Sequence, residues 1–297
     1  MSSKRLTTGG VQSSVTAVKE RLDDALPYIG ANGLAIAGAL VFAFPLYFLA
    51  VTSTLPINEM FSFPPRLLPG SQFTENYNQL FFETNFLQSM LNSFIYAGGS
   101  TIGVLVVATT AGYGLAKFEF FGRDPLFYMV LITLAIPFQL LSIPLFQLLV
   151  DFGLINTYTG LILPALATPI GLFFMKQNIE QTIPDDMLNS ARMDGASEFQ
   201  TFYHIVLPLL RPGLAALAVL MFLLRWNSLY WPLIVMRSEE KYVLTVFLAN
   251  IAGGVSSRTP WDIIMPAALV ATIPILLIFI FMQKHFVEGL VSGSLRE

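Results

Sequence analysis

Six long apolar stretches constrain this chain more than any other feature. They run over Gly33–Val51, Phe94–Leu115, Leu126–Val150, Leu154–Met175, Leu214–Met236 and Ile263–Met282. About 20 helical residues, each rising roughly 1.5 Å, cross a hydrocarbon core near 30 Å thick. Lipid offers the backbone no hydrogen bonds, so each stretch must satisfy its own as a helix. The sequence therefore predicts an all-α polytopic membrane protein with six transmembrane helices.

Composition agrees and excludes several function classes. Hydrophobic residues make up 55% of the 297 residues and charged residues only 12%, with a net charge of −3. Such a chain offers no basic surface for nucleic acid. It has no cysteine, which removes disulfides and thiolate sites, and its two histidines, His204 and His285, are too far apart to indicate a metal site.

The Lys and Arg residues between the stretches indicate the orientation. With the N-terminus inside, eleven fall on the inner side and four on the outer side, which favours cytoplasmic N- and C-termini. Residues 1–30 carry apolar side chains at helical spacing, so we expect an amphipathic helix on the inner membrane surface. An unstructured tail followed by an ordinary helix start is the alternative for this segment. The prolines within the stretches mark either kinks or hinges.

Motifs for chemistry are missing. The sequence contains no G-x-x-x-x-G-K-[ST], G-x-G-x-x-G, H-E-x-x-H or G-x-S-x-G. The six stretches also contain no Asp or Glu, so an ion relay through buried carboxylates has no members. If the protein moves a solute uphill, we expect the energy source on another chain.

One charge lies within a stretch. Arg225 is eleven residues from either end of Leu214–Met236, and a cation at that depth should face protein or an aqueous cavity. Trp226, Asn227, Tyr230 and Trp231 follow it, and these side chains are suited to stacking on and hydrogen-bonding a sugar. We interpret the five as a candidate solute pathway, with helix packing through polar contacts as the alternative.

A polar segment between two apolar stretches has the features of a helix-turn-helix. Pro184 suits the first helical position, with Asp185 and Asp186 in the first turn. Gly195 predicts a stop, and Ser197 with Gln200 predicts a capping box for a second short helix that ends near Pro208. Its apolar side chains would be exposed in the cytoplasm, which favours a protein partner over an amphipathic pair on the membrane surface.

The stretch "IPDDMLNSARMDGASEFQTFYHIVLPLLRP" resembles the E-A-A-x(3)-G-A…I-x-L-P signature of permease subunits of binding-protein-dependent ABC importers. Gly195 and Ala196 match the G-A, Ile205 follows nine residues later, and Leu207 with Pro208 matches the L-P. "FLLRWNSLYWPLIVM" and "FMQKHFVEGLVSGSLRE" are similar to stretches of the maltose-transporter-like sugar permeases of the second type. The resemblance covers the chain from about Ala31 onward.

This resemblance implies the type I importer fold over residues 31–297, with a coupling-helix loop at about 177–212 that docks a cytoplasmic ATPase. The docking residues implied are Asn189, Ser190, Ala191, Arg192, Asp194, Gly195, Ala196, Ile205, Leu207 and Pro208. It also implies a second permease subunit, two ATP-binding subunits that carry ATP and Mg, and an extracytoplasmic solute-binding protein. The chain itself would bind no cofactor and would be no enzyme.

Two positions depart from the family pattern. Asn189 stands where the family has glutamate, and Arg225 stands where similar permeases have a small or uncharged residue. The resemblance implies a multi-pass permease in the prokaryotic cell membrane that imports a mono- or oligosaccharide. Glycerol-3-phosphate or another anionic polyol is the alternative solute, favoured by Arg225. An autonomous secondary carrier is a further alternative, and a membrane-embedded enzyme would need a nucleophile or metal cluster that the sequence does not show.

Overall fold

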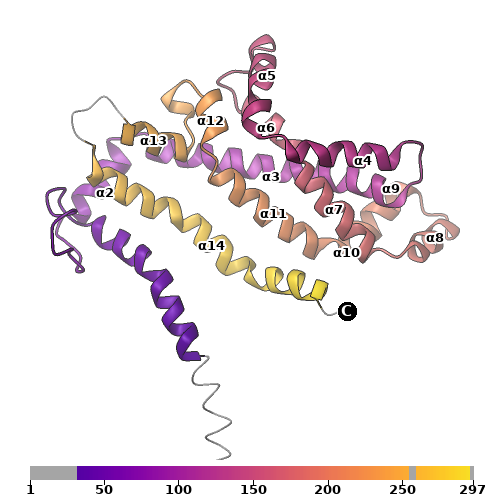
Figure 1. Cartoon of the computed structure of the whole chain (residues 1–297), viewed down its shortest axis with the longest axis horizontal. Coiled ribbons are helices and arrows are strands. Elements are labelled where there is room, and N and C mark those ends of the chain that lie inside the picture. Colours follow the sequence, from indigo (N-terminus) through magenta and orange to yellow (C-terminus); the bar gives the residue numbers. More distant parts are fainter. Residues whose placement is uncertain (1–31, 254–258, 295–297) are drawn as a thin grey trace, which may run out of the picture.

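The computed structural model describes residues 32–253 and 259–294, and the regular elements in these ranges are all helical. The amphipathic helix predicted within residues 1–30 lies outside them. After a first helix, Asn32–Thr52, the order is α2 Phe73–Phe82, α3 Phe86–Lys117, α4 Arg123–Ile132, η1 Thr133–Ala135, α5 Phe138–Asp151, α6 Tyr158–Leu166, α7 Pro169–Thr182, α8 Asp185–Met193, α9 Glu198–Thr201, η2 Phe202–Val206, α10 Leu207–Leu209, α11 Arg211–Trp226, α12 Tyr230–Val235, η3 Glu239–Lys241, α13 Leu244–Gly253 and α14 Trp261–Ser294 (Figure 1).

Three helices of the described ranges are long and apolar enough to cross a membrane unbroken: Asn32–Thr52, α3, and α14 over Trp261–Phe281. The number of possible membrane crossings rises from three to six only if each of three bent pairs of helices is counted as one span. Those pairs bend by 104° between η1 and α5, by 44° between α6 and α7, and by 73° between α10 and α11. The predicted spans Leu126–Val150 and Leu154–Met175 are therefore broken helices rather than continuous ones.

A proline lies within or next to each of these three breaks. Pro137 precedes α5, Pro169 opens α7, and Pro212 is the second residue of α11. A proline has no N–H to continue the helical ladder, and it biases the residue before it away from the helical region. Ile136 and Thr168 accordingly have extended backbones, with ψ of 120° and 121°. These prolines, at least, mark real kinks.

The span predicted over Leu214–Met236 is also interrupted. Helix α11 ends at Trp226 and α12 begins at Tyr230. The Asn227 amide nitrogen donates to the Leu223 carbonyl oxygen at 2.9 Å, which satisfies one of the last carbonyls of α11. Arg225 therefore lies one residue before a helix end rather than in the middle of a continuous helix.

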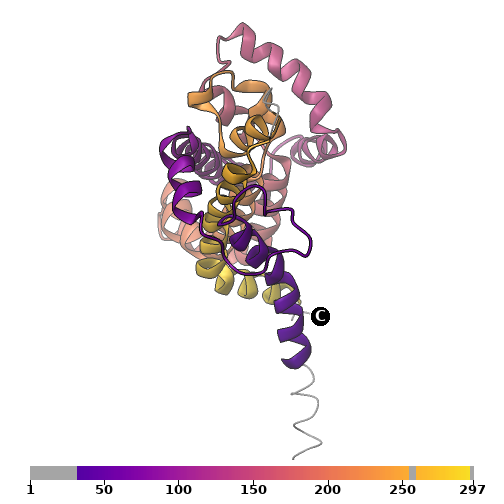
Figure 2. The same cartoon turned by 90° about the vertical axis from the view of Figure 1, so that its left-hand side faces the viewer.

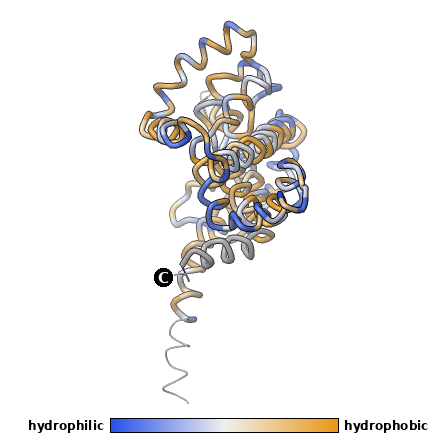
Figure 3. Tube along the Cα trace, turned by 90° about the vertical axis from the view of Figure 1, so that its right-hand side faces the viewer, coloured by the Kyte–Doolittle hydropathy of each residue, from blue (hydrophilic) through white to orange (hydrophobic). Residues whose placement is uncertain are grey.

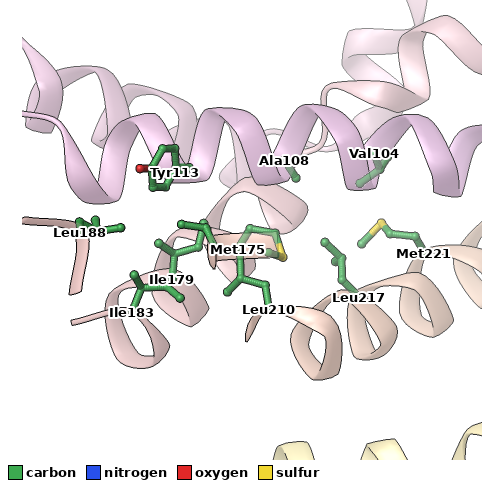
Figure 4. Packing of buried hydrophobic residues seen from close by; sticks show 11 residues of the cluster. Val104, Ala108, Tyr113, Met175, Ile179, Ile183, Leu188, Leu210, Leu217 and Met221 are labelled. Atoms are coloured by element: carbon green, nitrogen blue, oxygen red, sulfur yellow. The ribbon is translucent and has the colours of Figure 1, made fainter. Parts of the chain in front are cut away.

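Helix α3 runs through the centre of the molecule and packs against α6, α7 and α11 (Figure 1). The largest core cluster combines side chains of α3 with those of α7, α8, η2 and α11, which point toward one another in Figure 4. The helices approach closely where side chains are small. A Cβ at Gly112 would lie 3.0 Å from the Lys176 backbone nitrogen, so glycine allows α3 to contact the α7 backbone.

Other helices leave their apolar sides uncovered. Helix α5 projects away from the body formed by α3, α7 and α11 (Figures 1 and 2), and its Leu140, Ile143 and Leu148 are 62%, 71% and 50% exposed. The first helix is also exposed over most of its length. Hydrophobic residues run along the outer helices rather than only inside them (Figure 3). This distribution is that of a membrane protein, since lipid or other subunits can cover such surfaces.

Candidate functional site

The polar segment predicted as a helix-turn-helix lies at one end of the molecule, far from the loop that follows the first helix (Figure 1). Its first helix is α8, with Asp185 and Asp186 in the first turn and Arg192 in the last, a charge order that complements the helix dipole. Pro184 is the residue before the first helical position and not that position itself. The prediction for the start of α8 was thus wrong by one residue.

The turn after α8 is a Schellman motif. Gly195 has φ +82°, its N–H donates to the Arg192 carbonyl oxygen, and the Ala196 N–H donates to the Ala191 carbonyl oxygen, both at 3.0 Å. Glycine adopts this left-handed conformation without a steric penalty. The predicted stop at Gly195 is confirmed.

The second helix begins with the predicted capping box. The Ser197 hydroxyl accepts from the Gln200 N–H, and the Gln200 side chain accepts from the Ser197 N–H. The helix then passes through η2, a π-helical turn in which the Leu207 N–H donates to the Phe202 carbonyl oxygen. Pro208 follows and has no N–H for the His204 carbonyl. The predicted end near Pro208 agrees with the bend after Leu209.

A side-chain contact braces the two helices against each other. Arg192 Nε donates to Glu198 Oε1 at 2.7 Å across the Gly195 turn, and Arg192 Nη1 donates to Asn189 Oδ1 at 3.3 Å. The hydrogen bond that Arg192 donates to Glu198 raises the pKa of the Arg192 guanidinium above its usual range. Asn189 thus contacts a basic residue of its own helix.

The segment has one buried and one exposed face. Leu188, Ala191 and Val206 are buried, and Leu188 and Val206 belong to the largest core cluster. The predicted docking residues with exposed side chains include Asn189, Ser190, Asp194 and Pro208. Those that are half-buried are Ala196, Ile205 and Leu207. Large apolar or aromatic side chains are also exposed, most of all Met193 at 82%, Phe199 at 77% and Tyr203 at 59%. We name the segment Asp185–Leu209 the docking segment, after the role that we propose for it below; its outer face carries both polar and apolar side chains that no described residue covers.

The second group of predicted residues surrounds the break between α11 and α12. Arg225 is half-buried, and its Nη2 donates to the Ala165 carbonyl oxygen at 3.2 Å, near the end of α6. A cation at this position complements the negative end of the α6 dipole. Its Nε is buried and has no hydrogen-bond partner among the described residues. A backbone carbonyl is therefore one partner of Arg225, and part of its hydrogen-bonding capacity is unused.

The two tryptophans do not lie together. Trp226 is 4% exposed, donates from Nε1 to the Ala271 carbonyl oxygen at 3.2 Å, and packs in a cluster with Leu80 and Phe86. Trp231 is 3% exposed and belongs to a different cluster, which includes Tyr96. Both indoles are thus core residues. The five residues interpreted together as a candidate solute pathway therefore do not form one cluster, because the break at residues 227–229 lies between the tryptophans.

Asn227 and Tyr230 are the more accessible members of the group. Asn227 is exposed and Tyr230 is 40% exposed. A 2.8 Å hydrogen bond joins the hydroxyls of Tyr230 and Ser142, which connects α12 to the projecting α5. Of the five predicted residues, Arg225, Asn227 and Tyr230 therefore have polar atoms near the chain's surface.

Sequence reasoning missed two asparagines that organise the opposite end. Asn92 is fully buried, accepts from Gln88 and from the Tyr158 hydroxyl, and donates to the carbonyls of Glu240 and Tyr242. Asn156, at φ +59°, accepts from the backbone N–H groups of Arg237 and Ser238. These contacts connect the loop after α12 to α3 and α6. An amide within or beside an apolar stretch was the available signal, since such a group needs partners.

Among the residues whose side chains the structure describes, 32–253 and 259–281, no group of three or more His, Asp or Glu side chains is suited to a metal ion. The structure thus has a central helix bordered by proline-broken helices, with a polar, capped segment at one end. The chain belongs to the family of binding-protein-dependent transport system inner membrane components, which it matches over residues 106–291. It is thus a permease subunit of an ABC importer rather than an enzyme, as the sequence resemblance predicted.

Relatives of known role are similar over almost their whole length. The arabinooligosaccharides transport permease AraQ of Bacillus subtilis is 34% identical over 266 residues, covering 87% of this chain and 92% of the relative. The sn-glycerol-3-phosphate transport permease UgpE of Salmonella typhi is 35% identical over 275 residues, covering 90% and 96%.

A solved structure shares the fold. A chain of a bacterial ABC transporter involved in the import of the acidic polysaccharide alginate superposes with a TM-score of 0.77 at 23% identity, covering 90% of this chain and 98% of that one. The same kind of transporter in complex with an alginate-bound periplasmic protein superposes with a TM-score of 0.61. The all-helical permease fold expected from the sequence is confirmed at this level.

Proposed function

We propose that this chain forms half of the translocation path of an ATP-driven importer for a mono- or oligosaccharide in a prokaryotic cell membrane. A second permease subunit would form the other half, and an extracytoplasmic binding protein would deliver the solute. Two cytoplasmic subunits would bind and hydrolyse ATP with Mg, so this chain would bind no cofactor. Family membership supports this division of labour, and the relatives named for arabinooligosaccharides support the solute class.

The observation that carries the proposal is the docking segment. Its two helices are capped at both ends of the turn, cross-braced by Arg192 and Glu198, and anchored by Leu188 and Val206 in the core. Met193 and Phe199 nevertheless remain 82% and 77% exposed. A rigid element that presents apolar side chains without covering them is suited to insertion into a groove on another protein. We assign that groove to the ATP-binding subunit.

The docking residues have two roles in this proposal. Asn189, Ser190, Arg192 and Asp194 would contact the ATPase directly, because their side chains are exposed. The remaining members, Ala191, Gly195, Ala196, Ile205, Leu207 and Pro208, would set the shape of the segment. Docking in this chain would then depend on shape and apolar contact more than on a carboxylate at position 189.

An anionic polyol is the second candidate solute. Relatives named for sn-glycerol-3-phosphate transport are as similar to this chain as those named for arabinooligosaccharides. Arg225 keeps a buried Nε without a partner in the described part of the chain, so its guanidinium has unused donors. A phosphate or carboxylate is the ligand best suited to such donors.

We further propose that Arg225, Asn227 and Tyr230 line the solute path, with Trp226 and Trp231 holding them from the core. Arg225 contacts the end of α6, and Tyr230 contacts α5 through Ser142. The three residues therefore lie where four helices (α5, α6, α11 and α12) meet. Helix ends and breaks of this kind expose backbone groups that a polar solute can use.

Cysteine cross-linking tests the docking assignment directly. The chain has no natural cysteine, so single variants Met193→Cys and Phe199→Cys need no background changes. In membranes that contain the whole importer, both should cross-link to an ATP-binding subunit. Phe63→Cys is the matched control, because Phe63 is 95% exposed and belongs to the loop at the other end of the molecule. Equal cross-linking of all three variants, or none at positions 193 and 199, would reject the assignment.

Solute class needs a separate measurement. Uptake by the reconstituted importer, compared for an arabinooligosaccharide and for sn-glycerol-3-phosphate, distinguishes the two candidates. Transport of neither solute, with ATP hydrolysis intact, would reject both.

A further inference from the structure

Lys117, the last residue of α3, has a buried side chain that reaches the docking segment. Its side chain is only 5% exposed, and Nζ donates to the Ile183 carbonyl oxygen at 2.6 Å and to Asp185 Oδ1 at 2.7 Å. Ile183 is fully buried, whereas the Asp185 side chain is 79% exposed. One ammonium group therefore joins the end of the central helix to the two residues on either side of Pro184.

The position of Ile183 explains why it accepts this bond. Ile183 and Pro184 form the extended link between α7 and α8, where no helical N–H is available to the Ile183 carbonyl. Buried carbonyls need a partner, and a buried ammonium is costly unless its donors are used. Each group thus satisfies the other. The contact fixes the chain at the point where it enters α8, the first helix of the docking segment.

A second residue of α3 holds the other helix of the docking segment. Tyr113, one turn before Lys117, has its ring centroid 5.1 Å from that of Phe202 in η2. Its hydroxyl lies 3.5 Å from Glu198 Oε2, at the outer limit of a hydrogen bond. Glu198 is itself bound to Arg192. The last two turns of α3 therefore contact both helices, and only Lys117 does so through a buried charge.

Helix α3 extends from this end of the molecule to the opposite one (Figure 1), where Asn92 binds the loop after α12. Along the way it packs against α6, α7 and α11. If a displacement of α8 moved α3, then α3 and the helices packed on it, including those around Arg225, would move together as one rigid body. Without Lys117, α8 would still connect to α7 through the chain, but its link to α3 would consist of apolar contacts.

We propose that Lys117 is a positioning residue that couples the docking segment to α3, so that movement of the docked ATPase is transmitted to the central helix. The inference rests on the proposed docking function. It assigns to Lys117 no contact with solute or nucleotide. Its role is to keep ATP hydrolysis and solute movement in step.

The test uses the complete importer reconstituted in vesicles with its binding protein. Lys117→Met keeps the length and burial of the side chain but removes its charge and donors. We expect assembly and ATP hydrolysis to persist, while solute uptake per ATP hydrolysed falls about tenfold, the change in an equilibrium that one or two charge-assisted hydrogen bonds can support. Lys117→Arg retains donors and should recover most of the coupling.

Arg123→Met is the matched control. Arg123 lies six residues further along, and its ion pair is with the adjacent Asp124, so it joins no two elements. Its loss should leave uptake per ATP unchanged. An unchanged ratio in Lys117→Met as well would overturn the proposal, as would an equal fall in both variants.

If the importer that carries Lys117→Met does not assemble, a covalent link between α3 and α8 tests whether this connection couples ATP hydrolysis to uptake. The double variant Lys117→Cys/Asp185→Cys, cross-linked by a flexible bifunctional thiol reagent, replaces the ammonium contact. Recovery of coupled uptake on cross-linking would support the proposal, and assembly without such recovery would overturn it. Failure of the docking function itself would look different, because Met193→Cys would then not cross-link to the ATPase in the otherwise unaltered chain.

Discussion

Arg192 and Glu198 face each other across the turn at Gly195, with Nε and Oε1 2.7 Å apart. Both side chains are substantially exposed, at 38% and 46%, so the pair contributes little to global stability. Its effect is geometric, because it restrains the angle between α8 and α9. The shape that the docking segment offers to a partner therefore depends on a backbone turn and on one side-chain brace.

The turn is the first subject for mutation. Gly195→Ala should weaken the segment locally by about 1 kcal/mol, because an L-residue at φ +82° is strained. Gly195→Pro should abolish ATP-dependent uptake, since proline cannot adopt this φ. Uptake assays with equal amounts of membrane-inserted protein check both. Gly114→Ala is the control, because a Cβ there meets nothing within 4 Å, and normal uptake by Gly195→Pro would contradict the docking assignment.

Asn189 replaces the glutamate expected from the family resemblance, and the reverse change is informative. Asn189→Glu would place a carboxylate beside Arg192, whose Nη1 now donates to Asn189 Oδ1. We expect tighter association with the ATP-binding subunits, with a gain that shrinks at high salt because exposed charges are screened. Co-purification at two ionic strengths measures this. Asn189→Gln, which adds length without charge, should show no gain, and a gain equal to that of Asn189→Glu would exclude an electrostatic cause.

Arg225 is expected to affect the solute step rather than the ATPase contact. Arg225→Met should change the apparent affinity for solute or the turnover of the assembled importer, because it removes unused donors at the meeting of four helices. Leu224→Ala, on an exposed position of the same turn, is the control. Uptake kinetics distinguish a role of Arg225 in the solute path from a role in helix packing alone. Unaltered kinetics in Arg225→Met would leave only the capping of α6 as its role.

Asn92 should matter for stability more than for transport chemistry. Replacing it in Asn92→Leu would leave the Tyr158 hydroxyl and the carbonyls of Glu240 and Tyr242 without this partner. Each buried group left unpaired costs about 1–3 kcal/mol, so thermal unfolding in detergent should occur at a clearly lower temperature. Asn227→Ala, which removes only a bond from an exposed amide to its own helix, should shift the transition far less. Equal shifts of the unfolding temperature in the two variants would refute the conclusion that the hydrogen bonds of Asn92 stabilise the fold.

Local signals in the sequence predicted the docking segment well. The Gly195 stop and the Ser197–Gln200 box are decided by four or five neighbouring residues, and the structure has both. The predicted start of α8 was one residue too early, because Pro184 is also suited to the position just before a helix. The apolar stretches likewise predicted where the main helices lie.

Long-range geometry was harder to predict. Prolines indicated breaks, but the 104° bend before α5 and the 44° bend before α7 follow similar X-Pro pairs and differ in angle. Packing against helices that are distant in sequence determines such angles, and the hydropathy of a stretch contains no information about that packing. For the same reason the sequence grouped Trp226 and Trp231 in one candidate solute pathway, whereas the break at residues 227–229 lies between them and they pack in separate cores. The partner of Lys117, 66 residues away in sequence, left no local signal.

The π-helical turn η2 has a consequence for how this segment tolerates insertions and deletions. A π turn holds one residue more than the α-helical turn it replaces. Deleting one residue within Phe202–Val206 would restore regular helix and rotate everything before it by about 100° relative to α10, since a helix has 3.6 residues per turn. Met193 and Phe199 would then face a different direction while every motif residue remained present. The number of residues in η2, and not only their identity, therefore determines the direction in which Met193 and Phe199 face.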